Sequence, residues 1–116
     1  MDTKYIIKGK VIKGDGYGRK IGFPTVNLDA EIEELPKYGV YAGAGVLDSL
    51  EYKAGIIIGP TGKKGLPKIE AHLIGYNGDA YGKEVTLQIN KFLREYKKFD
   101  TEKELTAQIE KDLEMC

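Results

Sequence analysis

The chain has 116 residues, of which 18 are Lys or Arg and 18 are Asp or Glu, so its formal net charge is zero. Proteins that bind nucleic acid by neutralising phosphates normally carry a basic excess, so this composition argues against a nucleic-acid partner. Cys116 is the only cysteine, which excludes an intrachain disulfide and a thiolate metal cluster.

Six short runs have the composition and alternation of β-strands and are separated by glycine-rich turns. In chain order they are Tyr5–Ile12, Phe23–Leu28, Tyr38–Leu47, Tyr52–Ile58, Lys68–Tyr76 and Glu84–Leu93. In the third run Val and Ala alternate with Tyr and Gly, as in a strand covered on one face, and the sixth run has the clearest period of two. With no helical pattern between them, these runs predict a mainly β fold, an antiparallel barrel or sandwich.

The last segment has a helical pattern. Asp100 or Thr101 can cap a helix, and Thr101 and Glu104 have the spacing of a capping box. The apolar stripe that follows consists of Leu105, Ala107, Ile109 and Leu113. An amphipathic C-terminal α-helix that packs on the sheet is therefore expected.

A glycine-rich run begins at Gly14 and includes Gly16 and Gly18, with Arg19 and Lys20 directly after it. Glycines allow successive backbone N–H groups to converge on phosphate oxygens, and the two cations add positive charge. A flexible hairpin turn explains the same spacing equally well. The run is no dinucleotide-binding fingerprint, because no helical pattern follows it, and no Walker loop, because no Gly-Lys-Ser/Thr ends it.

Thr25 and Asn27 stand two residues apart in the second predicted strand, so their side chains share a face, roughly 7 Å apart. A hydroxyl and an amide carbonyl are oxygen ligands that Mg²⁺ accepts, together with phosphate oxygens and water. The alternative is that both side chains make turn or strand-end hydrogen bonds after Pro24.

Glu70 shares a face with His72 on a strand whose opposite face is apolar. A carboxylate in such a place can accept a proton from an alcohol. The alternative is a solvent-facing carboxylate beside a surface histidine. Arg94 can equally be a surface cation near a strand end, and His72 a structural residue or a neighbour of Glu70.

The run from Gly14 to Leu28 resembles the signature of riboflavin kinases, a domain that also forms the C-terminal half of bacterial bifunctional FAD synthetases. Further blocks match in the same order at residues 38–43, 69–73, 79–83, 92–95, 98–99 and 108–112. The resemblance covers nearly the whole chain, from Tyr5 to Asp112, and several ordered blocks are far more specific than any one motif.

This resemblance implies a six-stranded antiparallel Greek-key barrel with a C-terminal α-helix. It implies an ATP-dependent riboflavin kinase that uses Mg²⁺ and transfers the γ-phosphoryl group of ATP to the ribityl 5′-hydroxyl of riboflavin, giving FMN. The implied roles are nucleotide binding for Gly14, Gly16, Gly18, Arg19 and Thr25, metal binding for Thr25 and Asn27, catalytic base for Glu70, and flavin binding for Arg94 and Phe99.

The chain departs from the family pattern in three ways. The loop within residues 60–69 is shorter than usual, Val26 replaces the usual Ala, and no adenylyltransferase domain precedes the barrel, as expected of a stand-alone kinase or an excised domain. The short loop favours an alternative, a flavin- or nucleotide-binding regulatory barrel with weak or no turnover. Intact Thr25, Asn27 and Glu70 favour catalysis.

The length fits a single domain over residues 1–116, and we expect a monomer. A chain without disulfides suits the reducing cytoplasm, where we expect this protein to reside. The longest apolar stretch, Ala54–Ile58, is far shorter than the roughly 20 residues that cross a bilayer, so no membrane partner is expected. ATP and riboflavin are the expected partners.

Overall fold

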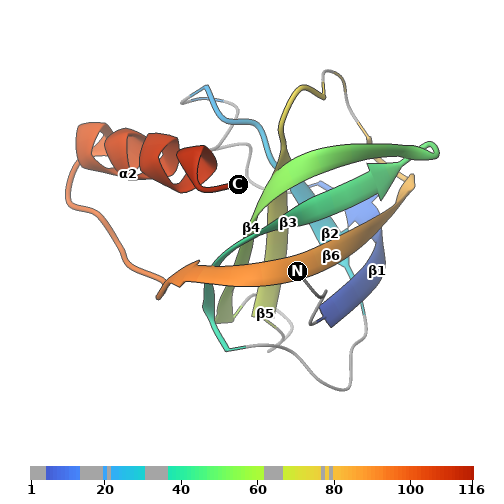
Figure 1. Cartoon of the computed structure of the whole chain (residues 1–116), viewed down its shortest axis with the longest axis horizontal. Coiled ribbons are helices and arrows are strands. Elements are labelled where there is room, and N and C mark those ends of the chain that lie inside the picture. Colours follow the sequence, from blue (N-terminus) through green and yellow to red (C-terminus); the bar gives the residue numbers. More distant parts are fainter. Residues whose placement is uncertain are drawn as a thin grey trace.

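The structure is a computed structural model that describes residues 5–13, 20, 22–30, 37–61, 67–76, 78 and 80–116. Six antiparallel strands form a closed barrel, and a C-terminal helix lies against its outside (Figure 1). The elements are β1 (Tyr5–Ile12), β2 (Val26–Asp29), β3 (Gly39–Leu47), β4 (Leu50–Thr61), β5 (Pro67–Leu73), β6 (Glu84–Arg94) and α2 (Glu102–Glu114). The predicted fold class is confirmed, as a barrel and not a sandwich.

The strand order around the barrel is β1-β2-β5-β4-β3-β6. Strands β3, β4 and β5 follow one another as antiparallel neighbours, and β5 returns to lie beside β2, which is the connectivity of a Greek key. This return matters for the site, because it places the residues around Thr25 beside the strand that carries Glu70.

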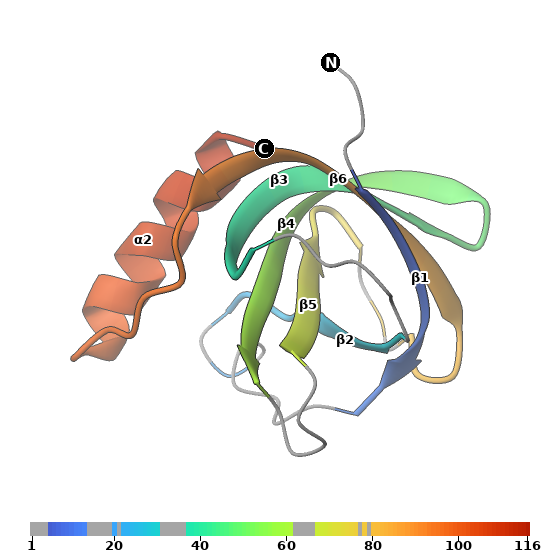
Figure 2. The ribbon, with the colours of Figure 1, turned by 90° about the horizontal axis from the view of Figure 1, so that it is seen from below.

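The barrel interior is filled by the inward-facing residues of each strand. The largest fully buried side chains are Ile7, Leu47, Ile56, Ile58, Val85, Leu87 and Ile89. The period of two predicted for β6 is confirmed, since alternate residues are buried there. In β3, however, Val40, Tyr41 and Ala42 are all buried, so the prediction of a strand covered on one face was wrong. The outer face of β3 is also covered, because α2 packs against β3 and β4 (Figure 2).

Three strand ends differ from their predicted positions for local reasons. Strand β2 begins at Val26 and not at Phe23, because Pro24 has no N–H with which to join a ladder. Strand β5 ends at Leu73, before Gly75, whose φ of +89° belongs to a turn. Strand β4 begins earlier than predicted, since a tight turn at residues 48–49 lets the hairpin with β3 continue to its tip.

Helix α2 begins after the predicted cap. The Thr101 Oγ1 accepts a hydrogen bond from the Glu104 backbone N–H at 3.1 Å. Ala107 is exposed and does not belong to the buried stripe, because it lies about 200° around the helix from Leu105. The buried residue of the helix is Asp112. Among the described residues, no helix is both long enough and apolar enough to span a bilayer.

Candidate active site

A cavity of about 420 Å³ lies between the outer face of the barrel and the C-terminal helix. Its lining residues are Phe23, Thr25, Val40, Gly55, Ile57, Gly59, Lys68, Glu70, His72, Arg94, Tyr96, Lys97, Lys98, Phe99, Leu105, Ile109, Asp112 and Leu113. We call the outward-facing residues of β2–β5, with those just before β2, the barrel wall. The residues from 94 to 113 form the helix wall. Thr25, Glu70, Arg94 and Phe99, predicted from separate motifs, therefore line one cavity.

The polar part of the barrel wall is set by the pairing of β2 with β5. Asn27 pairs with Glu70, so both side chains lie on the same face, with Cβ atoms roughly 5 Å apart. Glu70 is partly buried and lines the cavity, and its role as catalytic base stays a prediction. Thr25 lines the cavity one residue before β2, whereas Asn27 is on the same face but does not line it.

His72 connects β5 to the residues that lead into β2. Its Nδ1 lies 2.7 Å from the Pro24 carbonyl oxygen, and because a carbonyl can only accept, Nδ1 carries the proton. The His72 ring also meets the Phe23 ring edge to face, with centroids 6.0 Å apart. Sequence reasoning placed His72 beside Glu70 but gave no sign of this contact.

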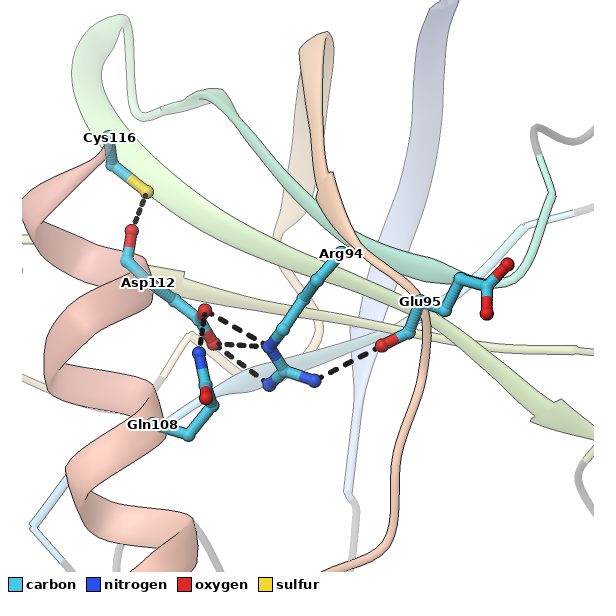
Figure 3. A network of polar contacts seen from close by, with 5 residues as sticks. All are labelled: Arg94, Glu95, Gln108, Asp112 and Cys116. Atoms are coloured by element: carbon cyan, nitrogen blue, oxygen red, sulfur yellow. Dashed lines mark hydrogen bonds and ion pairs between the residues drawn. The ribbon is translucent and has the colours of Figure 1, made fainter.

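In the helix wall, Arg94 forms a bidentate ion pair with Asp112 (Figure 3). The Arg94 Nε donates to both carboxylate oxygens at 3.0 and 3.1 Å, and Nη2 donates to Oδ2 at 2.8 Å. Nη1 donates to the Glu95 carbonyl, and the Gln108 amide donates to Asp112 Oδ1 at 3.0 Å. The side chains of Arg94 and Asp112 are 22% and 9% exposed, so this largely buried network joins the end of β6 to α2.

Asp112 is a residue whose role sequence reasoning missed. A carboxylate in the last turns of a helix lies near the negative end of the helix dipole, which is unfavourable unless cations or donors surround it. The signal was present, since Asp112 is a charged residue on the otherwise apolar stripe of Leu105, Ile109 and Leu113.

Phe99 lies beside the same guanidinium. The centre of the Arg94 guanidinium is 5.6 Å from the Phe99 ring centroid, and the Lys97 Nζ is 5.4 Å from it. The two residues predicted to bind a flavin are therefore neighbours, although the Arg94 guanidinium donates mainly to Asp112. Their flavin-binding role stays a prediction.

Helix α2 lies close to β4 at Gly55, and its C-terminal end is closed by a thiol hydrogen bond. A Cβ at Gly55 would lie 3.1 Å from Leu113 Cδ2, so the absence of a side chain there lets the helix approach the strand. The Cys116 thiol donates to the Asp112 carbonyl at 3.3 Å. Burial raises the pKa of the Cys116 thiol, and the nearby Asp112 carboxylate raises it further, while Lys53 acts in the opposite direction.

Some predicted residues lie outside the described part of the chain. They are Gly14, Gly16, Gly18 and Arg19, together with the centre of the short loop at residues 62–66. Within the described residues, no group of three or more His, Cys, Asp or Glu gathers as a metal site. The donors present beside Glu70 are a hydroxyl and an amide oxygen, which fit Mg²⁺ when phosphate oxygens complete its shell.

Comparison with known proteins agrees with these observations. A family model described as riboflavin kinase matches residues 1–116. The RNA-binding riboflavin kinase RibR of Bacillus subtilis is 40% identical over 93% of this chain and 48% of its own length. The bifunctional riboflavin kinase/FMN adenylyltransferase of the same organism is 40% identical over 93% of this chain and 36% of its own length. The chain thus spans less than half of these curated relatives.

Two solved structures have the same fold. A Streptococcus pneumoniae protein described as a macrolide-efflux protein superposes with a TM-score of 0.87 at 29% identity, over 94% of this chain and 37% of that one. A riboflavin kinase from Trypanosoma brucei superposes with a TM-score of 0.68 at 21% identity, over 95% of this chain and 75% of that one, and supports the fold alone. From the family model and the identity to its relatives, this chain belongs to the riboflavin kinase family.

Proposed function

We propose that this protein is an ATP-dependent riboflavin kinase, which transfers the γ-phosphoryl group of ATP to the ribityl 5′-hydroxyl of riboflavin and releases FMN and ADP. The observation that carries the proposal is the single cavity that joins Thr25 and Glu70 with Arg94 and Phe99. Family membership supports the same reaction. Phosphoryl transfer needs positioning and charge neutralisation more than covalent catalysis, so a few well-placed groups suffice.

Glu70 is the proposed general base. Its carboxylate accepts the proton of the riboflavin 5′-hydroxyl as the new bond forms from that oxygen to the γ-phosphorus. The bond from the γ-phosphorus to the bridging oxygen breaks, and ADP takes its electron pair. Partial burial and pairing on both sides, with Asn27 in β2 and Ile57 in β4, keep Glu70 in a defined place.

The Thr25 hydroxyl and the Asn27 side-chain oxygen are proposed to hold Mg²⁺ together with the nucleotide. The ion supplies neutralisation of the charge that develops on the transferring phosphoryl group. Both protein ligands are neutral, so metal binding depends on the phosphates. The run with Gly14, Gly16 and Gly18, followed by Arg19, is proposed to bind the phosphates through its backbone N–H groups.

The apolar part of the cavity suits the flat ring of a flavin. Ile57 of the barrel wall faces a helix wall that contains Leu105, Ile109 and Phe99, and these side chains offer surface for an aromatic ring. Arg94 provides a cation at the edge of this surface. The volume of about 420 Å³ falls within the roughly 300–1,000 Å³ of small-molecule sites.

We propose that the partners of this protein are ATP and riboflavin. We also propose that it is a cytoplasmic monomer with no membrane or nucleic-acid partner. The zero net charge supports the absence of a nucleic-acid partner. RNA binding is part of the name of the relative RibR, and this chain matches only 48% of the length of that protein. A titration of this chain with RNA at low salt, where such binding is strongest, tests the point.

Incubation of the purified chain with ATP, Mg²⁺ and riboflavin, followed by chromatography of the flavins, tests the proposed activity. We expect FMN to accumulate in wild-type protein and not in the Glu70→Gln variant. Binding of riboflavin and ATP without FMN would instead support the alternative, a regulatory barrel. If the chain neither binds riboflavin nor makes FMN, the proposed function is wrong.

A further inference from the structure

Thr25 stands where the strand ladders that surround it have ended. Strand β2 pairs with β5 at Val26 and Asn27, and its pairing with β1 covers residues 27–29. Thr25 precedes β2 and takes part in neither ladder, although it lines the cavity. The ladders that fix Asn27 opposite Glu70 therefore stop one residue short of the hydroxyl that the proposed reaction requires.

The contact from His72 reaches past the end of these ladders. The Nδ1–H donates to the carbonyl of Pro24 at 2.7 Å, and that carbonyl belongs to the peptide unit that joins Pro24 to Thr25. Proline also restricts its own φ, so a peptide unit held at its oxygen leaves little freedom for the next Cα. The edge-to-face contact with Phe23 holds the same ring from the adjoining residue.

We propose that His72 is a positioning residue, which holds the Pro24–Thr25 peptide and thereby sets the Thr25 hydroxyl relative to Glu70; this inference rests on the proposed function. His72 and Glu70 stand two residues apart on the same face of β5. One strand thus carries both the proposed base and the contact that places the proposed metal ligand. Hydrogen bonds that orient the ligands of a metal ion are worth roughly 10- to 100-fold in metal affinity.

The nitrogen that donates can be tested by a matched pair of variants. The side-chain nitrogen of Asn lies close to the place of the histidine Nδ1, whereas that of Gln lies close to Nε2. His72→Asn therefore keeps a donor for the Pro24 carbonyl, and His72→Gln moves it away. Both variants lose the ring contact with Phe23, so that loss cancels when the two are compared.

The first measurement is the apparent affinity for ATP across a Mg²⁺ titration, by calorimetry and by steady-state kinetics. We expect His72→Gln to weaken Mg²⁺-dependent ATP binding by roughly tenfold and His72→Asn to recover most of that loss. Melting curves confirm that each variant is folded. Equal losses in the two folded variants would show that the hydrogen bond has no positioning role.

A double-mutant cycle separates this role from a merely structural one. If His72 acts through Thr25, His72→Gln should have little further effect in a Thr25→Ala background. Independent, multiplying effects would overturn the proposal. Coupling with Glu70→Gln in place of Thr25→Ala would also overturn it, because His72 would then act on the base.

A third measurement requires neither activity nor mutation. His72 is the only histidine of the chain, so ¹⁵N spectra of labelled wild-type protein contain one pair of imidazole signals. In the neutral ring we expect the proton on Nδ1. A proton on Nε2 would rule out the Pro24 bond, and with it the proposal. Because ATP binding and the spectra do not depend on FMN formation, failure of the proposed function is distinguishable from failure of this inference.

Discussion

The two walls of the cavity are held in place by different kinds of contact. In the barrel wall, β5 is hydrogen-bonded to β4 along most of its length and to β2 at residues 70 and 71, so the position of Glu70 is set by backbone on both sides. In the helix wall, α2 is held to the barrel mainly through side chains, above all the pair of Arg94 with Asp112 and the contact of Leu113 at Gly55. The proposed base thus belongs to the wall fixed by backbone, and the proposed enclosure of the flavin to the wall fixed by side chains.

This difference predicts that changes in the barrel wall should alter activity with little effect on stability. Changes in the helix wall should alter stability and riboflavin affinity together. The difference also suits the proposed reaction, in which the base must stay in place while the flavin enters and leaves.

The largest effect is expected for Glu70→Gln in the barrel wall. The amide keeps the shape of the side chain but cannot accept the proton, so kcat should fall by roughly 100- to 10,000-fold. ATP affinity and melting temperature should change little. Glu84→Gln serves as a control, because Glu84 is exposed and remote from the cavity. A kcat near the wild-type value for Glu70→Gln would contradict the proposed base.

Thr25→Ala should weaken Mg²⁺-dependent ATP binding and turnover together, by up to roughly 100-fold, because one of two proposed protein ligands is lost. Thr25→Ser keeps the hydroxyl and should retain most of the activity. The fold should survive in both variants, since Thr25 lies outside the ladders of β2. Wild-type kinetics for Thr25→Ala across the whole Mg²⁺ titration would contradict the metal-binding role and favour the alternative, a strand-end hydrogen bond.

Asp112→Asn tests the helix wall. The substitution leaves the Arg94 guanidinium without its carboxylate partner, and one-sided removal from a buried pair costs roughly 3–5 kcal/mol. Because Arg94 is 22% exposed, water compensates in part, and we expect a loss of about 2 kcal/mol in the free energy of unfolding. The KM for riboflavin should rise while ATP affinity stays unchanged.

The matched control for Asp112→Asn is Glu110→Gln, an exposed position on the same helix, which should leave stability and KM as they are. An equal rise in the KM for ATP and for riboflavin would show that the two walls do not act separately. Denaturant unfolding and steady-state kinetics on the same samples provide both measurements.

Much of the barrel was predictable because its signals are local. The alternation of Val85, Leu87 and Ile89 and the cap at Thr101 depend on neighbouring residues, and the structure confirms both. What local patterns missed were contacts between distant segments. The covered outer face of β3 depends on where α2 docks, and no period within residues 38–47 reports that.

The candidate site divides in the same way. Thr25 and Glu70 could be selected from the sequence because their side chains suit a metal ligand and a base. The Greek-key return of β5 to β2 then places both in one cavity. The pairing of Arg94 with Asp112 was not predicted, because its two members come from different elements and meet only after docking. The bond from His72 to Pro24 was likewise invisible, since its acceptor is a backbone carbonyl that any residue carries.

The smallest effect concerns Cys116, which follows α2 just beyond the helix wall. Burial, together with the Asp112 carboxylate, raises the pKa of the thiol above its ordinary value of 9.0 in the folded protein. Between the ordinary pKa and the raised one, the folded state binds more protons than the unfolded state, so the free energy of unfolding falls as pH rises through this range. Below 9.0 the thiol is protonated in both states and the contribution is fully present.

Cys116→Ser should remove this part of the pH dependence, because the hydroxyl does not titrate in that range while it can still donate to the Asp112 carbonyl. The pKa of Tyr41 is also raised by burial, but Tyr41 is common to both proteins and cancels in their difference. We therefore expect the difference in unfolding free energy between wild type and Cys116→Ser to stay constant below the ordinary thiol pKa. Above that pKa it should move in favour of the variant, as denaturant titrations at successive pH values would measure. A difference that stays constant over the whole range would mean that Cys116 is as accessible to water in the folded protein as in the unfolded chain. Helix α2 would then be docked less tightly on the barrel than its close approach at Gly55 indicates.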